Sequence, residues 1–315
     1  MIDLSIVTTL YRSAPFIDEF YDRVCRAASS LEASFEIVFV NDGSPDDSLE
    51  RALRLHARDP RVRVIDLSRN FGHHKAIMTG LERSCGRLVF LLDSDLEEDP
   101  AWLARFHAEL RQSGADVVYG VQRTRKGGWF ERATGAMYYR LFNALLEHPI
   151  PQNVVTARLM TRRYVDQLVR HRDREVCLAG LWVMTGFEQL PVTVEKGSRE
   201  HPAYGHRERL SVMVNALTSF SNRPLVLIFY VGCAIMLTSV VAAVYLVVRA
   251  LRHGFGVPGW PSLIVSVWFL GGMTIFSLGI IGIYLAKIFT ETKDRPYTVV
   301  RAEYSRESIG VGQSR

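Results

Sequence analysis

Two aspartates follow one apolar run in the sequence LVFLLDSDLEED of residues 88–99. Asp93 and Asp95 are two residues apart, and residues at this spacing in an extended segment lie on the same face. Paired carboxylates can hold Mg²⁺ or Mn²⁺, hard cations that prefer oxygen ligands and complete their coordination with water and substrate phosphates. The alternative is an ordinary acidic loop after a strand, since Asp-x-Asp also arises by chance. The neighbouring motifs therefore decide between the two interpretations.

Two other polar segments carry groups that suit a phosphorylated ligand. VNDGS at residues 40–44 places Asp42 where a carboxylate could accept hydrogen bonds from a ribose or a base, although these residue types are also common in turns. SRNFGHHKAIMTGL at residues 68–81 contains Gly72, which permits close backbone approach, and Lys75, which could meet a phosphate at a helix start. We interpret His73 as solvated, because adjacent histidines on a loop usually are.

Each polar segment ends an apolar run that is typical of a buried strand. Such runs occupy residues 4–10, 35–40, 62–67, 88–92 and 116–119, and helical patterns occupy residues 16–31, 46–57, 74–84 and 100–113. Alternating strands and helices predict an α/β fold with a mostly parallel, Rossmann-like sheet, in which ligands bind at the carboxyl ends of the strands. No G-x-G-x-x-G motif follows the first run and no P-loop motif occurs, which argues against dinucleotide-binding enzymes and P-loop NTPases.

Residues 225–248 and 262–286 form two long apolar segments without a charged residue. Each would span roughly 36 Å as a helix, at about 1.5 Å per residue, and could cross about 30 Å of hydrocarbon. The alternative is a pair of buried helices in a soluble core, which rarely run this far without a polar face. The segments therefore predict a two-helix transmembrane hairpin in a lipid bilayer.

The basic residues predict how this hairpin is oriented. The loop 249–261 contains two of them, Arg249 and Arg252, whereas the segment after residue 286 contains six: Lys287, Lys293, Arg295, Arg301, Arg306 and Arg315. The positive-inside tendency then predicts a multi-pass protein of the cytoplasmic (inner) membrane, with a cytoplasmic domain 1–208, a short external loop 249–261 and a cytoplasmic tail 287–315. Residues 209–224 are predicted as an amphipathic juxtamembrane helix, and residues 129–146 either lie on the membrane surface or pack on the domain.

Composition narrows the choice of class further. The four cysteines form no C-x-x-C pair, so a zinc site and a disulfide framework are both disfavoured and a reducing compartment fits. Residues 1–5 show no basic start to a cleavable signal peptide. The net charge of +5, with clustered arginines, suits anionic lipid or phosphate ligands, and no motif indicates nucleic-acid binding.

In order, VTTLYRSAPFI, VNDGS, SRNFGHHKAIMTGL and LLDSDLEEDP resemble the successive blocks of a family 2 glycosyltransferase with a GT-A fold. The apolar pair, with NRPL before it and YLAKIFTETKDRPY at its exit, resembles the polyprenyl-phosphate glycosyltransferases, the dolichol-phosphate-mannose-synthase-like branch. The resemblance covers roughly residues 4–300. It implies inverting transfer of a sugar from a nucleotide diphosphate-sugar to a polyprenyl (undecaprenyl) phosphate on the cytoplasmic leaflet, with Mg²⁺ or Mn²⁺.

The expected site residues follow from the resemblance and from the needs of a phosphate acceptor. The nucleotide-sugar set is Thr9, Tyr11, Asp42, Asn70, Lys75 and Asp93; Asp93 and Asp95 hold the metal; Arg123, Arg125 and Arg158 bind the acceptor phosphate; Asp95, Glu97 and Glu175 are the catalytic candidates. Where the family usually has D-F-R-L this chain has TARLM, so Thr156 replaces an expected Asp, and LEEDP has one residue more than the usual block. A phosphate monoester, with a second pKa of about 6, is largely dianionic near neutral pH and needs little help from a base.

Two other functions stay open at this point. One is transfer to a hydroxyl of a lipid-linked or surface glycan, which would need a general base within hydrogen-bond reach. Processive synthesis is disfavoured, because the nearest string to the Q-x-x-R-W block is QLVRH at residues 167–171. The other is a non-catalytic, membrane-anchored subunit that binds a nucleotide-sugar. The small residues of GIIGIYLA, 279–286, would also permit close helix packing in a homo-oligomer.

Overall fold

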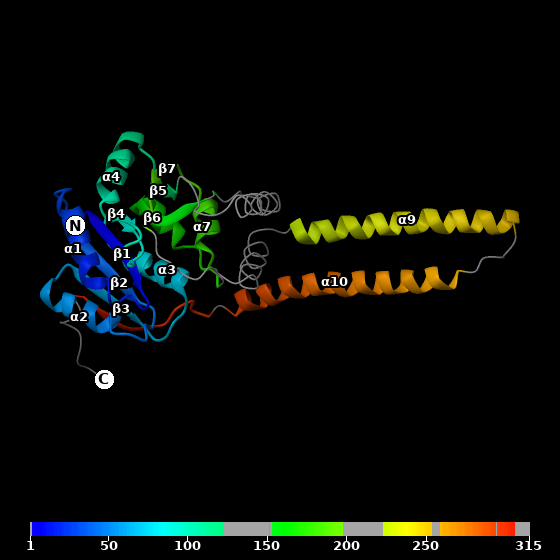
Figure 1. Cartoon of the computed structure of the whole chain (residues 1–315), viewed down its shortest axis with the longest axis horizontal. Coiled ribbons are helices and arrows are strands. Elements are labelled where there is room, and N and C mark those ends of the chain that lie inside the picture. Colours follow the sequence, from blue (N-terminus) through cyan, green and yellow to red (C-terminus); the bar gives the residue numbers. More distant parts are fainter. Residues whose placement is uncertain are drawn as a thin grey trace. The chain divides into compact units, whose positions relative to one another are not determined.

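The structure is a computed structural model that describes residues 2–122, 151, 153–174, 176–197, 223–253, 259–293 and 295–305 (Figure 1). The chain divides into two compact units. The first contains residues 1–139, 148–203 and 295–315, and the second contains residues 140–147 and 204–294.

The first unit is built on one mixed sheet. Its strands are β1 (Leu4–Leu10), β2 (Phe35–Asn41), β3 (Val62–Leu67), β4 (Leu88–Leu91), β5 (Val117–Gln122), β6 (Val154–Thr161), β7 (Gln189–Val194) and β8 (Val300–Tyr304). Their order in the sheet is β7-β5-β6-β4-β1-β2-β3-β8. The central strands β4, β1, β2 and β3 are parallel, which confirms the predicted α/β class. β6 runs antiparallel to β4 and β5, and β8 runs antiparallel to β3.

Helices flank this sheet. They are α1 (Ile17–Ser29), α2 (Ser48–Arg58), α3 (His73–Arg83), α4 (Trp102–Ser113), α6 (Arg162–Leu168) and α7 (Leu178–Met184). α1 buries Ile17, Phe20, Val24 and Ala28, a three-to-four-residue spacing that puts one apolar face against the core. Every residue of β1 and β2 is buried, as expected for parallel strands that are covered on both faces.

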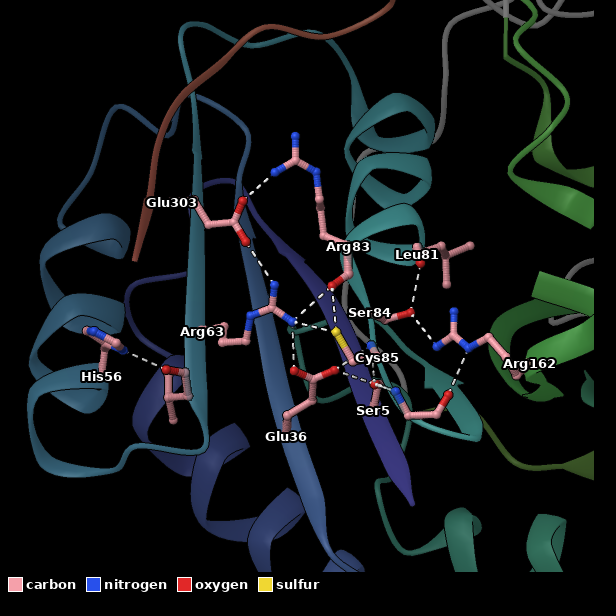
Figure 2. Close-up of polar contacts among 12 residues, drawn as sticks. Ser5, Glu36, His56, Arg63, Leu81, Arg83, Ser84, Cys85, Arg162 and Glu303 are labelled. Carbon is pink, nitrogen blue, oxygen red and sulfur yellow. Dashed lines mark hydrogen bonds and ion pairs between the residues drawn. The ribbon is translucent and has the colours of Figure 1, made fainter. Parts of the chain in front are cut away.

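A polar cluster joins the amino-terminal ends of the central strands to β8, as Figure 2 shows. The buried Glu36 of β2 accepts hydrogen bonds from Ser5 Oγ at 2.5 Å and from the Cys85 N–H at 2.7 Å, and pairs with Arg63 at 2.8 Å. Arg63 also pairs with Glu303 of β8 at 2.8 Å. The cluster therefore attaches β8 near the amino-terminal ends of β1 to β3. The candidate site lies at the carboxyl ends of these strands.

The second unit contains α9 (Arg223–His253) and α10 (Trp260–Thr292). Within the described residues, one stretch, Ser266–Thr292 of α10, is long and apolar enough to cross a membrane, with a mean hydropathy of 1.9, and a shorter apolar stretch is Leu225–Ile235. Large apolar side chains on α10 are exposed, among them Trp268 and Ile275. The predicted segment at residues 129–146, and residues 209–222 of the juxtamembrane helix predicted at 209–224, lie outside the described residues, whereas residues 223 and 224 begin α9.

Candidate functional site

The candidate site forms where the parallel strands end. Thr9 lies near the end of β1, Asp42 follows β2, the loop 68–72 follows β3, and Asp93 follows β4. Because the carboxyl ends of adjacent parallel strands share one edge of a sheet, these groups come together. Hydrogen bonds and an ion pair between the four segments show that they are in contact.

Asp42 shapes the loop that follows β3. It is 2% exposed, and its two carboxylate oxygens accept hydrogen bonds from the Phe71 N–H at 2.7 Å and the Gly72 N–H at 3.0 Å. Burial raises the pKa of Asp42, although both hydrogen bonds favour the charged form. Gly43 is required beside it, because its φ is +58° and a Cβ there would come within 2.5 Å of the Arg69 and Asn70 backbone.

His73, the first residue of α3, connects two strand ends. Its Nδ1 lies 3.0 Å from Thr9 Oγ1, and its Nε2 lies 3.3 Å from Asp93 Oδ1. Burial opposes a charge on the imidazole, but the Asp93 carboxylate outweighs it and raises the pKa of His73 above its ordinary value. The interpretation of His73 as a solvated loop residue therefore missed a contact that helps to build the site.

Glu98 is a second group that the sequence did not single out for the site. Its side chain is fully buried, and its carboxylate accepts hydrogen bonds from the Thr156 N–H at 2.9 Å and the Asp93 N–H at 3.3 Å. Burial, with the nearby charge of Asp93, raises the pKa of Glu98 to about 8. Lys196 lies 4.0 Å from Glu98 and 3.0 Å from Glu97. It brings one positive charge to the acidic turn, residues 93–99.

Asp93 is held from several sides. Thr156 Oγ1 donates to Asp93 Oδ2 at 3.0 Å, so the residue that stands in place of the expected Asp is a hydrogen-bond donor to the first aspartate. Burial would raise the pKa of Asp93, but the hydrogen bond and charge of His73 outweigh it and lower that pKa. Asp93 therefore carries its negative charge at neutral pH.

The residues of the acidic turn fit a hard divalent cation. Asp93 Oδ1 is buried, and its partner among the described residues is His73 Nε2 at 3.3 Å. The pKa of Asp95 is raised by burial and by the charges of Asp93 and Glu97. A cation bound beside them would balance the buried charge of Asp93 and lower the pKa of Asp95. No cluster of three or more His, Cys, Asp or Glu ligands occurs within the described part of the chain. Mg²⁺ often binds through one or two carboxylates plus substrate phosphates, so Asp93 and Asp95 are the residues that would hold it here.

The other predicted residues are placed differently from one another. Tyr11 and Asn70 are exposed, Lys75 is half-buried, and Glu97 lines an open hollow of about 300 Å³ together with Asp95. Arg123, Arg125 and Glu175 lie outside the described residues.

Arg158, in β6, is buried. Its Nε donates to the Thr156 carbonyl at 3.2 Å, and its guanidinium lies over the Trp182 ring, 2.9 Å from the centroid. Burial lowers the pKa of Arg158 to about 9. The guanidinium is thus engaged within the domain, and its predicted role towards an acceptor phosphate stays a prediction.

Comparison with known proteins identifies the family. Residues 5–169 match the model of glycosyl transferase family 2. A Mycobacterium tuberculosis protein described as "Putative glycosyltransferases" is 50% identical over 304 residues, which cover 96% of this chain and 89% of that one. The bactoprenol glucosyl transferase of Shigella phage SfV is 30% identical over 303 residues, covering 95% of this chain and 98% of that one.

Among solved structures, glucosyl-3-phosphoglycerate synthase from Mycobacterium tuberculosis in complex with UDP is similar, with a TM-score of 0.48 and 18% identity over 70% of this chain and 80% of that one. The identification does not depend on this likeness, because the family model alone matches more than half of the sequence. The chain therefore belongs to glycosyl transferase family 2 and is a glycosyltransferase.

Proposed function

We propose that this glycosyltransferase moves a sugar, with inversion, from a nucleotide diphosphate-sugar to a polyprenyl phosphate at the cytoplasmic face of the inner membrane. The observation that carries the proposal is the meeting of Asp42, His73 and Asp93 at one edge of the sheet, with Asp95 two residues after Asp93. The chain also contains the apolar helix α10. Relatives named bactoprenol glucosyl transferase, which match this chain along 95% and 96% of its length, support a polyprenyl acceptor.

The donor would lie across the ends of β1 to β4. Asp42 and the loop 68–72 that it holds would bind the nucleoside, with Thr9, Tyr11 and Asn70 beside it and Lys75 near the phosphates. Asp93 and Asp95 would hold Mg²⁺ or Mn²⁺, which when bound neutralises the charge of the departing nucleoside diphosphate. His73 and Thr156 would keep Asp93 ionised and fixed in direction.

The acceptor explains why Thr156 can replace an aspartate. An oxygen of the dianionic phosphate attacks the anomeric carbon, the bond from that carbon to the diphosphate breaks, and the electron pair leaves with the nucleoside diphosphate. No proton has to be removed from this nucleophile, so the site needs no strong base. Transfer to a hydroxyl is the second candidate, and Glu97 or Glu175 would then be the base; Glu97 lines the open hollow beside Asp95.

The membrane arrangement is also a proposal. Helices at residues 225–248 and 262–286 would form the hairpin, with the domain 1–208 and the tail 287–315 on the cytoplasmic side and residues 209–224 at the interface. Arg123, Arg125 and Arg158 would provide cations for the lipid phosphate. A homo-oligomer would add helices to a thin two-helix bundle. The described part of α10, with its exposed apolar side chains, supports this placement.

The test uses the full chain, solubilised in detergent and supplied with undecaprenyl phosphate. Labelled nucleotide-sugars are screened with Mn²⁺, with Mg²⁺ and with EDTA, and the lipid product and the released nucleoside diphosphate are measured together. We expect one donor to give a metal-dependent product that Asp95→Asn abolishes. Asp99→Asn is the matched control, because Asp99 lies on the same turn but is exposed. Absence of any lipid product, with transfer to a glycan hydroxyl instead, would replace the proposal with the second candidate.

A further inference from the structure

The strand β8, which follows the apolar helix α10 in sequence, forms the edge of the sheet next to β3. β3 leads into the loop 68–72, here called the donor loop because we propose that it binds the donor. β8 pairs antiparallel with β3, with Ile65 opposite Glu303, Asp66 opposite Ala302 and an irregularity between Asp66 and Leu67. α10 ends at Thr292, so only residues 293–299 separate it from β8. The strand therefore lies at the edge of the sheet, beside the strand that leads into the loop 68–72.

This C-terminal segment holds Ser68, where that loop begins, by both of its backbone polar groups. The Ser68 N–H donates to the Val299 carbonyl at 2.9 Å. The Ser68 carbonyl accepts a hydrogen bond from Arg301 Nη2 at 2.6 Å. Ser68, the first residue of the loop 68–72, is thus held by Val299 and Arg301, which are distant from it in sequence.

Arg301 is also connected to the turn at Asp42, through contacts with Asp66 and Asn41. Its Nη1 lies 3.4 Å from Asp66 Oδ2, and the other Asp66 oxygen accepts a hydrogen bond from Asn41 Nδ2 at 2.8 Å. The Asp66 side chain is 4% exposed, and Arg301 supplies a positive charge beside its buried carboxylate. Asn41 directly precedes Asp42, whose oxygens hold the far end of the same loop at Phe71 and Gly72.

Other contacts fix the segment itself. Thr298 Oγ1 lies 2.8 Å from Thr79 Oγ1 of α3, and Tyr297 Oη donates to Glu82 at 3.1 Å. At the other end of β8, Glu303 pairs with Arg63 and Arg83, as Figure 2 shows. Arg301 is therefore carried by a strand that is anchored on both sides of it.

We propose that Arg301 is a positioning residue for the nucleotide-sugar: it sets the shape of the loop 68–72, and through Asp66 and Asn41 that of the Asp42 turn. Donor affinity would then depend on the polypeptide that leaves the apolar helix. The inference rests on the proposed function insofar as this loop binds the donor. Its structural part, the dependence of the loop on Arg301, can be tested without any donor.

The first experiment is hydrogen exchange on the full chain in detergent, without donor. Arg301→Ala should speed exchange of the Phe71 and Gly72 amides about fivefold, as expected for the loss of one hydrogen bond of ordinary strength. Exchange in α1 should not change, which separates local loosening from general unfolding. Arg301→Lys keeps a donor for the Ser68 carbonyl and should exchange more slowly than Arg301→Ala. Arg54→Ala, which removes an exposed ion pair with Glu50 on α2, is the matched control and should leave the loop unchanged.

The second experiment measures transfer with the donor that supports it in the assay described above. Arg301→Ala should raise the donor KM about fivefold and leave kcat close to the wild-type value, whereas a general loss of folded protein would lower the rate at every donor concentration. Unchanged exchange at residues 68–72 in Arg301→Ala overturns the inference even if transfer is confirmed. Faster exchange with an unchanged KM overturns the link to the donor. Failure of transfer with every donor, combined with faster loop exchange, would count against the proposed function alone.

Discussion

Glu98 offers a prediction in which the sign of a stability change reverses with pH. Replacing Glu98 by Gln keeps one acceptor oxygen and loses the other, so either the Asp93 or the Thr156 N–H is left without its acceptor. An unsatisfied buried donor costs about 1–3 kcal/mol. At low pH, where the wild-type carboxyl is neutral, Glu98→Gln should therefore be less stable than wild type by this amount.

The wild-type protein should lose this advantage as the pH rises. The pKa of Glu98 is raised from 4.5 to about 8 in the folded state, so its stabilising contribution is complete below pH 4.5 and is lost as the pH rises through 8. A difference of about 3.5 pH units, at about 1.36 kcal/mol per unit, sets a ceiling of about 5 kcal/mol. Glutamine does not ionise, so at pH 9 the variant should be as stable as wild type or more stable.

The assay is thermal unfolding of the full chain in detergent with EDTA, because a cation on Asp93 would itself change the ionisation of Glu98. For a domain of this size, about 2–4 °C corresponds to 1 kcal/mol, so the variant should melt about 2–12 °C lower at pH 4, below the unfolded-state pKa. Glu50→Gln, on the exposed face of α2, is the control and should follow wild type throughout. A gap between Glu98→Gln and wild type that stays constant from pH 4 to pH 9 would refute the reasoning.

Asp95→Asn should reduce transfer at least about 100-fold and weaken the dependence on Mn²⁺, measured by initial rates in a metal titration, because the amide oxygen carries no charge. Asp42→Asn can accept only one of the two loop hydrogen bonds, so the donor KM should rise about tenfold; an unchanged KM would remove Asp42 from the donor site. Glu36→Gln breaks a buried ion pair with Arg63 and should destabilise the domain by about 3 kcal/mol in thermal unfolding. Its rate per folded molecule should be that of wild type, since Glu36 lies at the opposite strand ends.

The central half of the sheet was predictable because its information is local. The apolar runs at residues 4–10 and 62–67 coincide with β1 and β3, and those at 35–40 and 88–92 differ from β2 and β4 by one residue. The meeting of Asp42 and Asp93 then follows from parallel topology. β6, β7 and β8 were missed because distant pairing defines them; the pair Arg63 and Glu303, for example, joins residues 240 positions apart.

Glu98 and Lys196, which the sequence analysis did not assign to the site, were missed for a different reason. After Asp95 the backbone turns through Leu96 at a φ of +62°, and this turn sends Glu98 into the interior. The alternation of side chains along β4 ends at Leu91, so the sequence pattern could not predict that the Glu98 side chain is buried. Lys196 follows β7, a strand that was not predicted, and its approach to Glu97 had no local signal.

The antiparallel pairing of β8 with β3 also bears on how the protein can be produced. A shortened protein that stops before α9 would keep β1 to β7 but lose β8, and β3 would become an open strand edge. Such an edge presents unpaired N–H and C=O groups to any other chain and favours aggregation. A soluble version for crystallisation or assay would therefore need residues 295–305 joined back to the domain by a short linker in place of the two helices.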